Sequence, residues 1–143
     1  MLSRRHRIAD GDDYRLTVRR GARAGADGMT ISALLHEDFS TPTRFGFIIT
    51  KRVGVAVVRN RMRRRLKAIT AGMLEKFPTG VDVIIRVHPE AVALDFAALE
   101  AGTRSAIARA VKRAERENRR RPSDQPAVLS TSTPTFAAEP NRA

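Results

Sequence analysis

The segment that most constrains the fold lies mid-chain, where apolar side chains recur at the spacing of a helix. At about 100° per residue they form one stripe, made of Val58, Met62, Leu66, Ile69 and Met73. Pro78 and Gly80 then end the helix. A helix with one apolar stripe has to cover another layer of structure, so we expect a packed domain that leaves the other side of this helix in water.

That other side is basic and has no acidic residue before Glu75. We expect it to carry Arg59, Asn60, Arg63, Arg64 and Lys67, with the stems of Arg61 and Arg65 on its flanks. A helix face that is merely solvated normally mixes charges, because each i,i+4 pair of opposite charges stabilises the helix by a few tenths of a kcal/mol. The cations of this face are neighbours of like charge and repel one another. A polyanion relieves the repulsion, and the guanidinium fork suits phosphate. Asn60 both donates and accepts, which suits a base edge, a 2′-hydroxyl or a metal-bound water.

The charge of the whole chain indicates the same class of partner. The 143 residues include 27 Lys and Arg against 15 Asp and Glu, a formal net charge of +12. Residues 39–74 carry nine of these cations and no acid. Such an excess favours nucleic acid first and acidic membrane surfaces second. The length suits one domain with a tail, and 42% hydrophobic residues exclude a wholly disordered chain.

Candidate catalytic groups are few. The absence of cysteine excludes disulfides, thiolate catalysis and Cys-ligated metals, and it fits a reducing cytoplasm. No window approaches the roughly 18–20 apolar residues of a membrane span. His6, His36 and His88 lack metal-ligand spacing, and Asp10-Gly-Asp-Asp13 lacks the later Glu of a calcium loop. The residues alone therefore favour binding over chemistry.

Around the basic helix the sequence predicts a short helix, three strands and a last helix, over residues 11–20, 29–36, 44–51, 81–88 and 95–118. Asp12 or Asp13 is expected to cap the first helix and Asp95 the last. The Gly- and Ala-rich residues 21–28 are expected to connect two elements, and from Arg119 the composition is typical of a disordered tail. The pattern predicts an α+β fold with helices against one small sheet.

Two aromatic features bear on ligand binding. In the strand over residues 44–51, Phe45, Phe47 and Ile49 share one face, and Gly46, Ile48 and Thr50 share the other. Tyr14, the only tyrosine, lies on the first predicted helix. It either packs in the core with its hydroxyl in water or stacks on an unpaired base, a contact of roughly 1–3 kcal/mol in single-strand binders.

The segment Lys51-Arg-Val-Gly-x-Ala-Val-x-Arg-Asn-Arg-x-Arg-Arg64 resembles the signature of the protein subunit of bacterial ribonuclease P. Supporting similarity lies at Arg7-Ile8, Asp13-Tyr14, Gly21, Arg44-Phe-Gly-Phe and Asp82, so the resemblance covers residues 4–115. It implies a two-layer α/β sandwich whose small mixed sheet contains a left-handed βαβ crossover through the signature helix, although most such crossovers are right-handed. The domain would span residues 1–118 and the disordered tail residues 119–143.

The resemblance also implies a function. The family's protein binds a large catalytic RNA, and together they remove the 5′ leader from precursor tRNA in the cytoplasm, with no membrane and no obligate protein partner. Magnesium is held mainly by the RNA, and none is bound by the protein alone. The implied RNA contacts are Lys51, Arg52, Arg59, Asn60, Arg61, Arg63, Arg64 and Lys67, and the implied leader cleft contains Tyr14, Ile48 and Thr50.

Four positions depart from the family pattern. Val18 and Ser32 stand where aromatic residues are common, Val55 replaces a frequent Asn, and His88 a frequent Arg. With fewer aromatic residues for stacking, we expect leader affinity to depend more on phosphate neutralisation and to fall more steeply with salt.

Three other functions compete with this one. A ribosome- or tRNA-associated RNA-binding protein without a processing role has the same composition, and only the signature separates the two. A free-standing nuclease needs carboxylates that converge on a metal, and residues 39–74 contain none. A membrane-surface helix needs Trp or Phe anchors, which the apolar stripe lacks.

Overall fold

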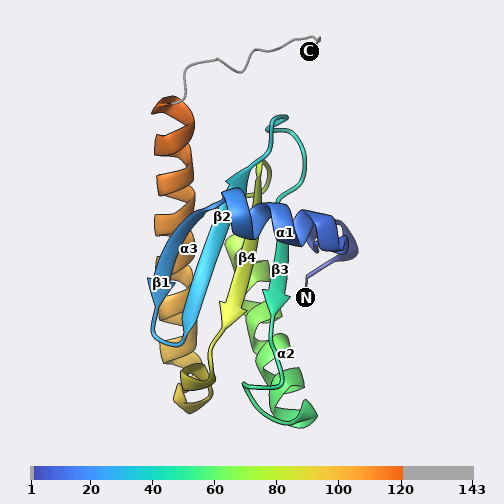
Figure 1. The fold of residues 1–143 in the computed structure, drawn as a ribbon, viewed down its shortest axis with the longest axis vertical. Helices are drawn as coiled ribbons and strands as arrows, with labels where there is room; N and C mark the ends of the chain where they lie inside the picture. The colour runs from blue at the N-terminus through green and yellow to red at the C-terminus, as the bar shows by residue number, and fades with distance from the viewer. Residues whose placement is uncertain (1, 121–143) are drawn as a thin grey trace.

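The computed structural model describes residues 2–120, whose elements are shown in Figure 1. Within them, the helices are α1 (Gly11–Arg20), α2 (Ala56–Met73) and α3 (Phe96–Arg120). The strands are β1 (Ala22–Ala26), β2 (Met29–Leu35), β3 (Arg44–Ile48) and β4 (Val81–Val87). Two short 3-10 turns, η1 (Arg4–His6) and η2 (Pro89–Ala93), precede α1 and α3.

The strands form one mixed sheet in the order β1-β2-β4-β3. β1 is antiparallel to β2, β2 is antiparallel to β4, and β3 is parallel to β4. The register pairs Ile85 of β4 with Ile31 on one side and Phe47 on the other, so alternate residues of the strands build one apolar face. The predicted α+β class with a small mixed sheet is confirmed.

The crossover between the parallel strands has the rare hand. α2 connects β3 to β4. In Figure 1 both strands point downward, β4 lies to the left of β3, and α2 lies behind the sheet. This path is left-handed, as the family resemblance implied and against the general preference.

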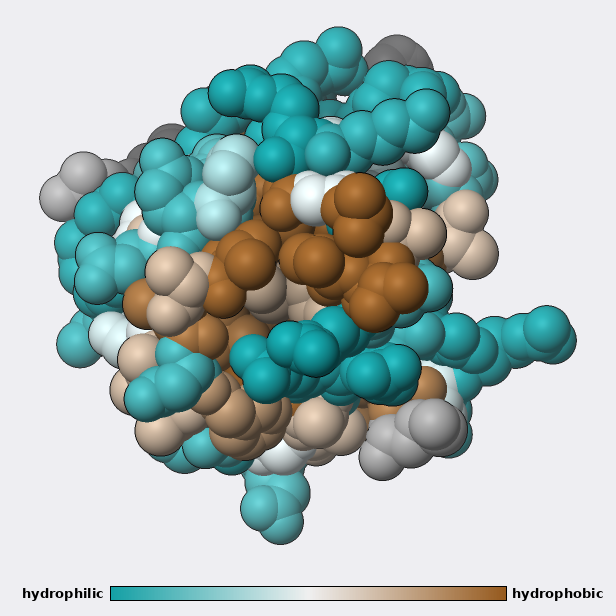
Figure 2. All heavy atoms as spheres, turned by 90° about the horizontal axis from the view of Figure 1, so that it is seen from below, coloured by the Kyte–Doolittle hydropathy of each residue, from teal (hydrophilic) through white to brown (hydrophobic). Residues whose placement is uncertain are grey.

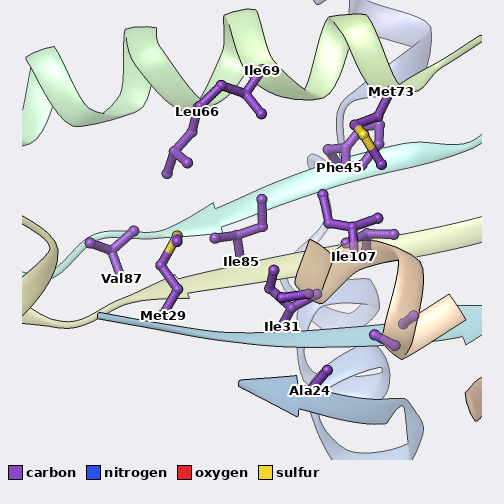
Figure 3. Close-up of a cluster of buried hydrophobic side chains, with 14 of the residues drawn as sticks. Ala24, Met29, Ile31, Phe45, Leu66, Ile69, Met73, Ile85, Val87 and Ile107 are labelled. Atoms are coloured by element: carbon purple, nitrogen blue, oxygen red, sulfur yellow. The ribbon is translucent and has the colours of Figure 1, made fainter. Parts of the chain in front are cut away.

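α2 and α3 together cover one face of the sheet and enclose the core. Figure 3 shows Leu66, Ile69 and Met73 of α2 close to Phe45 and Ile85 of the sheet. Burying a side chain of this size contributes about 1.5–3 kcal/mol, so the stripe is sufficient to fix how α2 lies on the sheet. From α3, the completely buried residues include Leu99, Ala106, Ile107 and Ala110.

α1 lies on the other face of the sheet, in front of it in Figure 1. Its cap is Asp10, whose carboxylate accepts a hydrogen bond from the N–H of Asp12 at 2.9 Å. The prediction that Asp12 or Asp13 caps this helix is therefore wrong. The predicted cap of α3 is confirmed, since the carboxylate of Asp95 accepts from the N–H of Ala98 at 2.8 Å.

Residues 22–26, predicted as a connection, form strand β1 instead. Their sequence Ala-Arg-Ala-Gly-Ala lacks the β-branched and aromatic residues that indicate a strand. Pairing with β2 and cover by α3 stabilise it, and its small residues let α3 approach closely, with Ala24 6% exposed. Gly28 closes the hairpin at φ 78°, where a Cβ would lie 2.6 Å from the backbone of Ala91.

Several element ends differ from the sequence prediction. β2 and β4 each end one residue earlier than predicted, at Leu35 and Val87. β3 ends at Ile48 rather than residue 51, and residues 51–53 form a turn instead. α3 runs to Arg120, two residues past the predicted domain boundary, and the rest of the predicted tail, residues 121–143, lies outside the described residues. Among residues 2–120, no helix combines the length and apolar character that crossing a membrane requires.

Candidate nucleic-acid interface

The polar residues of α2 form a surface that we name the α2 ridge. Its members are Arg59, Asn60, Arg61, Arg63, Arg64, Arg65 and Lys67. Four residues of the apolar stripe orient the helix, because Met62, Leu66, Ile69 and Met73 are each at most 4% exposed. The fifth, Val58, is only half-buried. With the stripe fixed against the sheet, the charged side of α2 is directed away from the core.

Exposure along the α2 ridge differs from the expectation. The exposed members are Asn60, Arg61 and Arg64, and the half-buried members are Arg59, Arg63, Arg65 and Lys67. At 100° per residue, Arg59 is only about 60° from the centre of the stripe, and its Nε donates to the carbonyl of Gly54 at 3.1 Å. Arg59 is thus a flanking residue, whereas Arg61, which was predicted on a flank, is one of the two exposed cations of the ridge.

The α2 ridge has no acidic partner within the described part of the chain. The ion pairs there, with N···O distances up to 4.0 Å, involve Arg15, His36, Arg44 and Arg104 instead. Within the ridge, Nη1 of Arg63 donates to Oδ1 of Asn60 at 3.0 Å. This leaves the amide NH2 of Asn60 as a donor beside a row of like charges.

The turn before α2 carries two further candidate contacts, Lys51 and Arg52, both exposed. Val53, 6% exposed, anchors the turn in the core. Its N–H donates to the carbonyl of Thr50 at 3.0 Å, and the N–H of Gly54 donates to that of Lys51 at 3.2 Å. Both cations therefore lie on a defined turn that leads directly into the α2 ridge.

An apolar patch lies at the end of the molecule where α2 and α3 begin. Figure 2, which shows this end from below, has a brown area bordered by hydrophilic side chains. Val55 and Val57 at the start of α2 are 70% and 72% exposed, and Val92 and Phe96 near the start of α3 are 43% and 41% exposed. Apolar and basic surface therefore adjoin at the N-terminus of α2.

Tyr14 lies against the sheet face that α1 covers. Its hydroxyl accepts a hydrogen bond from the N–H of Phe47 at 3.2 Å, and the residue is half-buried. The ring fits because residue 46 is glycine, where a Cβ would lie 2.7 Å from Cζ of Tyr14. Ile48 is half-buried on the same strand face as Gly46, whereas Thr50 is exposed beyond the end of β3.

The positions that depart from the family pattern have different surroundings. Ser32 is 4% exposed on the face covered by α1, and Val18 of α1 is half-buried. Neither supplies an aromatic ring near Tyr14. His88 lies just past β4, with its Nε2 2.8 Å from Oγ1 of Thr30.

A second charged site, the Asp82 cluster, consists of Asp13, His36, Arg44 and Asp82. Arg44 binds both carboxylate oxygens of Asp82, with Nε–Oδ1 3.0 Å and Nη2–Oδ2 2.6 Å. His36 Nε2 donates to Oδ1 of Asp82 at 2.6 Å, and Arg44 Nη1 lies 3.2 Å from Oδ2 of Asp13. The hydrogen bond with Asp82 raises the pKa of Arg44 above its ordinary value, against the opposing effect of partial burial. Nothing in the sequence analysis anticipated this cluster.

A hollow of about 730 Å³ opens beside the Asp82 cluster, and Arg20, Glu117 and Asn118 also line it. The implied leader-cleft residues Tyr14, Ile48 and Thr50 do not line this hollow. Among residues 2–120, no group of three or more His, Cys, Asp or Glu side chains is placed to hold a metal ion. The geometry therefore directs attention to the basic surface of α2.

The sequence model of the Ribonuclease P family matches residues 2–115, which include the sheet, α1, α2 and most of α3. The chain belongs to the ribonuclease P protein family. The ribonuclease P protein component of Clavibacter michiganensis subsp. michiganensis is 48% identical over 112 residues, 78% of this chain and 98% of that protein. The ribonuclease P protein component of Kocuria rhizophila is 38% identical over 113 residues, 79% of this chain and 98% of that protein.

Solved structures of ribonuclease P proteins have the same fold. The Staphylococcus aureus protein superposes with a TM-score of 0.63 at 16% identity, over 71% of this chain and 92% of its own. The Thermotoga maritima protein superposes with a TM-score of 0.62 at 17% identity, over 71% of this chain and 94% of its own. Membership of this family implicates the chain in a tRNA-processing ribonuclease and disfavours the ribosome-associated alternative.

Proposed function

We propose that this chain binds the catalytic RNA of a ribonuclease P holoenzyme through the α2 ridge and assists that RNA in removing the 5′ leader of precursor tRNA. The supporting observation is the row of cations without a carboxylate within 4.0 Å among the described residues. Like charges one helical turn apart destabilise a free helix. RNA phosphates offset that cost, and the release of their counterions drives binding.

The members of the α2 ridge take different roles in this proposal. Arg61 and Arg64 are the two exposed cations of the ridge and make the first phosphate contacts. Arg59 acts through position, because its bond to the carbonyl of Gly54 ties α2 to the turn that presents Lys51 and Arg52. The ridge and the turn together form one continuous RNA contact.

The leader binds along the sheet face next to Tyr14 in this proposal. The hydrogen bond from the N–H of Phe47 and the absence of a side chain at Gly46 fix the ring of Tyr14 in place. Because Val18 and Ser32 add no second ring there, stacking contributes little and neutralisation of phosphate contributes most. The salt dependence of leader binding should accordingly exceed that of relatives with several aromatic residues at these positions.

The catalytic groups belong to the RNA in this proposal. The resemblance to the family assigns the magnesium to the RNA, where it would activate water and stabilise the leaving oxygen. The protein's own contribution is electrostatic. A chain of net charge +12 between two polyanions lowers their mutual repulsion and so strengthens substrate binding.

The test replaces the two exposed cations of the α2 ridge, Arg61→Gln with Arg64→Gln, and measures affinity for the catalytic RNA across salt concentrations. Loss of two phosphate contacts should weaken binding roughly tenfold to a hundredfold and lower the salt slope by about 1.5–2. The matched control is Arg15→Gln with Arg104→Gln, which removes the same charge from cations that already pair with Asp12 and Glu100. Equal losses in both variants would contradict a specific role for the ridge.

The location of catalysis has a separate test. The RNA alone should cleave precursor tRNA at high magnesium and high salt. Addition of the Arg61/Arg64 variant under these conditions should not change the cleavage rate. An RNA that stays inactive without protein under every ionic condition would contradict the assignment of the catalytic groups to the RNA.

A further inference from the structure

The edge of the sheet formed by β1 is closed by side chains of α3. An edge strand presents carbonyls that no neighbouring strand binds. Here Nη2 of Arg109 donates to the carbonyl of Gly25 at 2.7 Å, and Nη1 of Arg113 donates to that of Arg23 at 2.6 Å. The two guanidinium groups are therefore held in place while they remain exposed to solvent.

These arginines belong to a larger basic surface, which we name the β1–α3 edge. Its members, all exposed, are Arg23, Arg109, Lys112, Arg113, Arg116 and Arg119. At 100° per residue, the five from α3 fall within an arc of about 120°, and Glu115 and Glu117 fall outside it on opposite sides. No carboxylate of residues 2–120 lies within 4.0 Å of any of the six.

The contact of Arg113 is informative because an acid is available one turn away. Glu117 stands at i+4, the spacing at which an exposed ion pair normally forms. Arg113 nevertheless donates to the strand, and the side chain of Glu117 lines the hollow beside the Asp82 cluster. The cation is thus left without a charged partner within the described residues, as on the α2 ridge.

We propose that the β1–α3 edge is a second RNA-binding surface, which takes the phosphate backbone of a helical RNA segment while the α2 ridge holds the catalytic RNA. This inference rests on the proposed function. The strand order β1-β2-β4-β3 places the two surfaces toward opposite edges of the sheet, with α3 beside β1 and α2 behind β3 and β4 in Figure 1. One protein molecule thereby bridges two RNA segments.

The chemistry of the β1–α3 edge favours backbone contacts over base recognition. Between Arg109 and Arg119, every residue within this arc of α3 is Arg or Lys, so the arc has no aromatic, Asn or Gln side chain to stack on a base or bind its edge. The row from Arg109 to Arg119 is about 15 Å long at the rise of an α-helix, which suits several consecutive phosphates. Guanidinium groups already fixed by backbone carbonyls lose less entropy when they bind, and each keeps further N–H donors.

A membrane surface is a poorer match for the same charges. An interfacial helix inserts an apolar face next to its basic one. The apolar face of α3 is already occupied, since Leu99 and Ile107 are completely buried against the sheet. Between Arg109 and Arg119 this arc carries no apolar side chain.

The test counts short RNA duplexes, about 16 base pairs of arbitrary sequence, bound per protein by native mass spectrometry and by titration. The wild-type protein should bind two. Lys112→Gln with Arg116→Gln, which leaves both carbonyl contacts of β1 intact, should weaken the second site at least tenfold and leave one duplex bound. Arg61→Gln with Arg64→Gln should weaken only the site on the α2 ridge. The variant that combines all four substitutions should weaken both sites.

The outcomes separate this inference from the proposed function. A wild-type protein that binds one duplex, lost only in the Arg61/Arg64 variant, would overturn the second surface and leave the proposed function standing. The second surface would also be overturned if the control Arg15→Gln with Arg104→Gln lost duplex binding as strongly as the Lys112/Arg116 variant, because the control removes cations that are already paired. If vesicles of phosphatidylglycerol bind the wild type but not the Lys112/Arg116 variant while duplex stoichiometry stays at two, the edge is a membrane surface and the inference fails.

Discussion

Arginine serves opposite purposes in the Asp82 cluster and on the α2 ridge. Arg44 binds both oxygens of a carboxylate that is 7% exposed, and a second acid, Asp13, lies 3.2 Å away. Arg61 and Arg64 are exposed and have no carboxylate within 4.0 Å among the described residues. The first arrangement compensates a buried charge, whereas the second costs stability that a partner's negative charge recovers.

The position of each region in the fold explains the difference. Asp82 lies within an apolar strand, between Val81 and Val83, and a buried carboxylate needs a partner because desolvation of a lone charge is expensive. The α2 ridge is in water, so no such demand exists and repulsion is tolerated. Charges are compensated where burial requires it and left uncompensated where a ligand binds.

The largest effect is expected from Asp82→Asn, which removes the charge that Arg44 and His36 share. The unfolding free energy should fall by about 3 kcal/mol, because one partner of a mostly buried pair is left without its counter-charge. Urea unfolding at pH 7 measures it. Since the pKa of Arg44 is raised, its contribution is fully present at pH 7 and would be lost only in strongly alkaline solution.

The double variant Asp82→Asn with Arg44→Gln is the control for this pair. It should cost much less than the sum of the two single changes, because no charge is then left uncompensated. Additive losses would mean that the two side chains act independently, and the contrast with the α2 ridge would lose its basis.

A smaller effect is expected when a carboxylate is placed on the α2 ridge. Ala68 is exposed one turn after Arg64, so Ala68→Glu supplies the i,i+4 partner that the helix lacks. Relative to Ala68→Gln, which has a similar helix propensity, the unfolding free energy of Ala68→Glu should be higher by a few tenths of a kcal/mol. Its affinity for the catalytic RNA should be roughly tenfold lower, about 1.4 kcal/mol. Urea unfolding measures the stability and filter binding measures the RNA affinity. Ala68→Gln is the control for the size of the side chain. Unchanged RNA affinity would argue against contact at this part of α2.

The next effect comes from the exposed side of the Asp82 cluster. Asp13 is 36% exposed in its side chain and meets Arg44 at 3.2 Å, so solvent screens much of the attraction. Asp13→Asn should lower the unfolding free energy by about 0.5–1 kcal/mol, well below the loss from Asp82→Asn. Equal losses at the two positions would show that burial does not decide what an ion pair contributes here.

Periodicity was sufficient to predict most elements of this fold from the sequence. The spacing of Leu66, Ile69 and Met73 was sufficient to predict the side of α2 that is buried. α2 itself ends at Met73, several residues before the predicted breakers Pro78 and Gly80. β1 was missed because its alanines carry no strand preference of their own and are held by β2 and α3. Tertiary context of this kind has no local signal.

The candidate site was predictable in composition but not in detail. The absence of acids along α2 is visible in the sequence, yet the inward turn of Arg59 depends on the position of the Gly54 carbonyl. The Asp82 cluster did have a signal. Asp82 interrupts an apolar strand, and a buried acid requires a cation, which residues 39–74 supply as Arg44. Which cation pairs with Asp82 could not be predicted from the sequence, because it depends on the parallel pairing of β3 with β4 that sets residue 44 beside residue 82.

The smallest expected effect has an unusual sign. Arg64→Gln exchanges two residues of similar helix propensity and removes repulsion from Arg61 and Lys67, so the unfolding free energy should rise by a few tenths of a kcal/mol at low salt. The gain should disappear near 0.5 M salt, where the Debye length falls below the spacing of these side chains. Arg15→Gln, which removes a cation already paired with Asp12, should give no gain at either salt concentration. A loss of stability in the Arg64 variant at low salt would mean that the ridge is compensated within the folded protein, and the reason for expecting an RNA partner there would be gone.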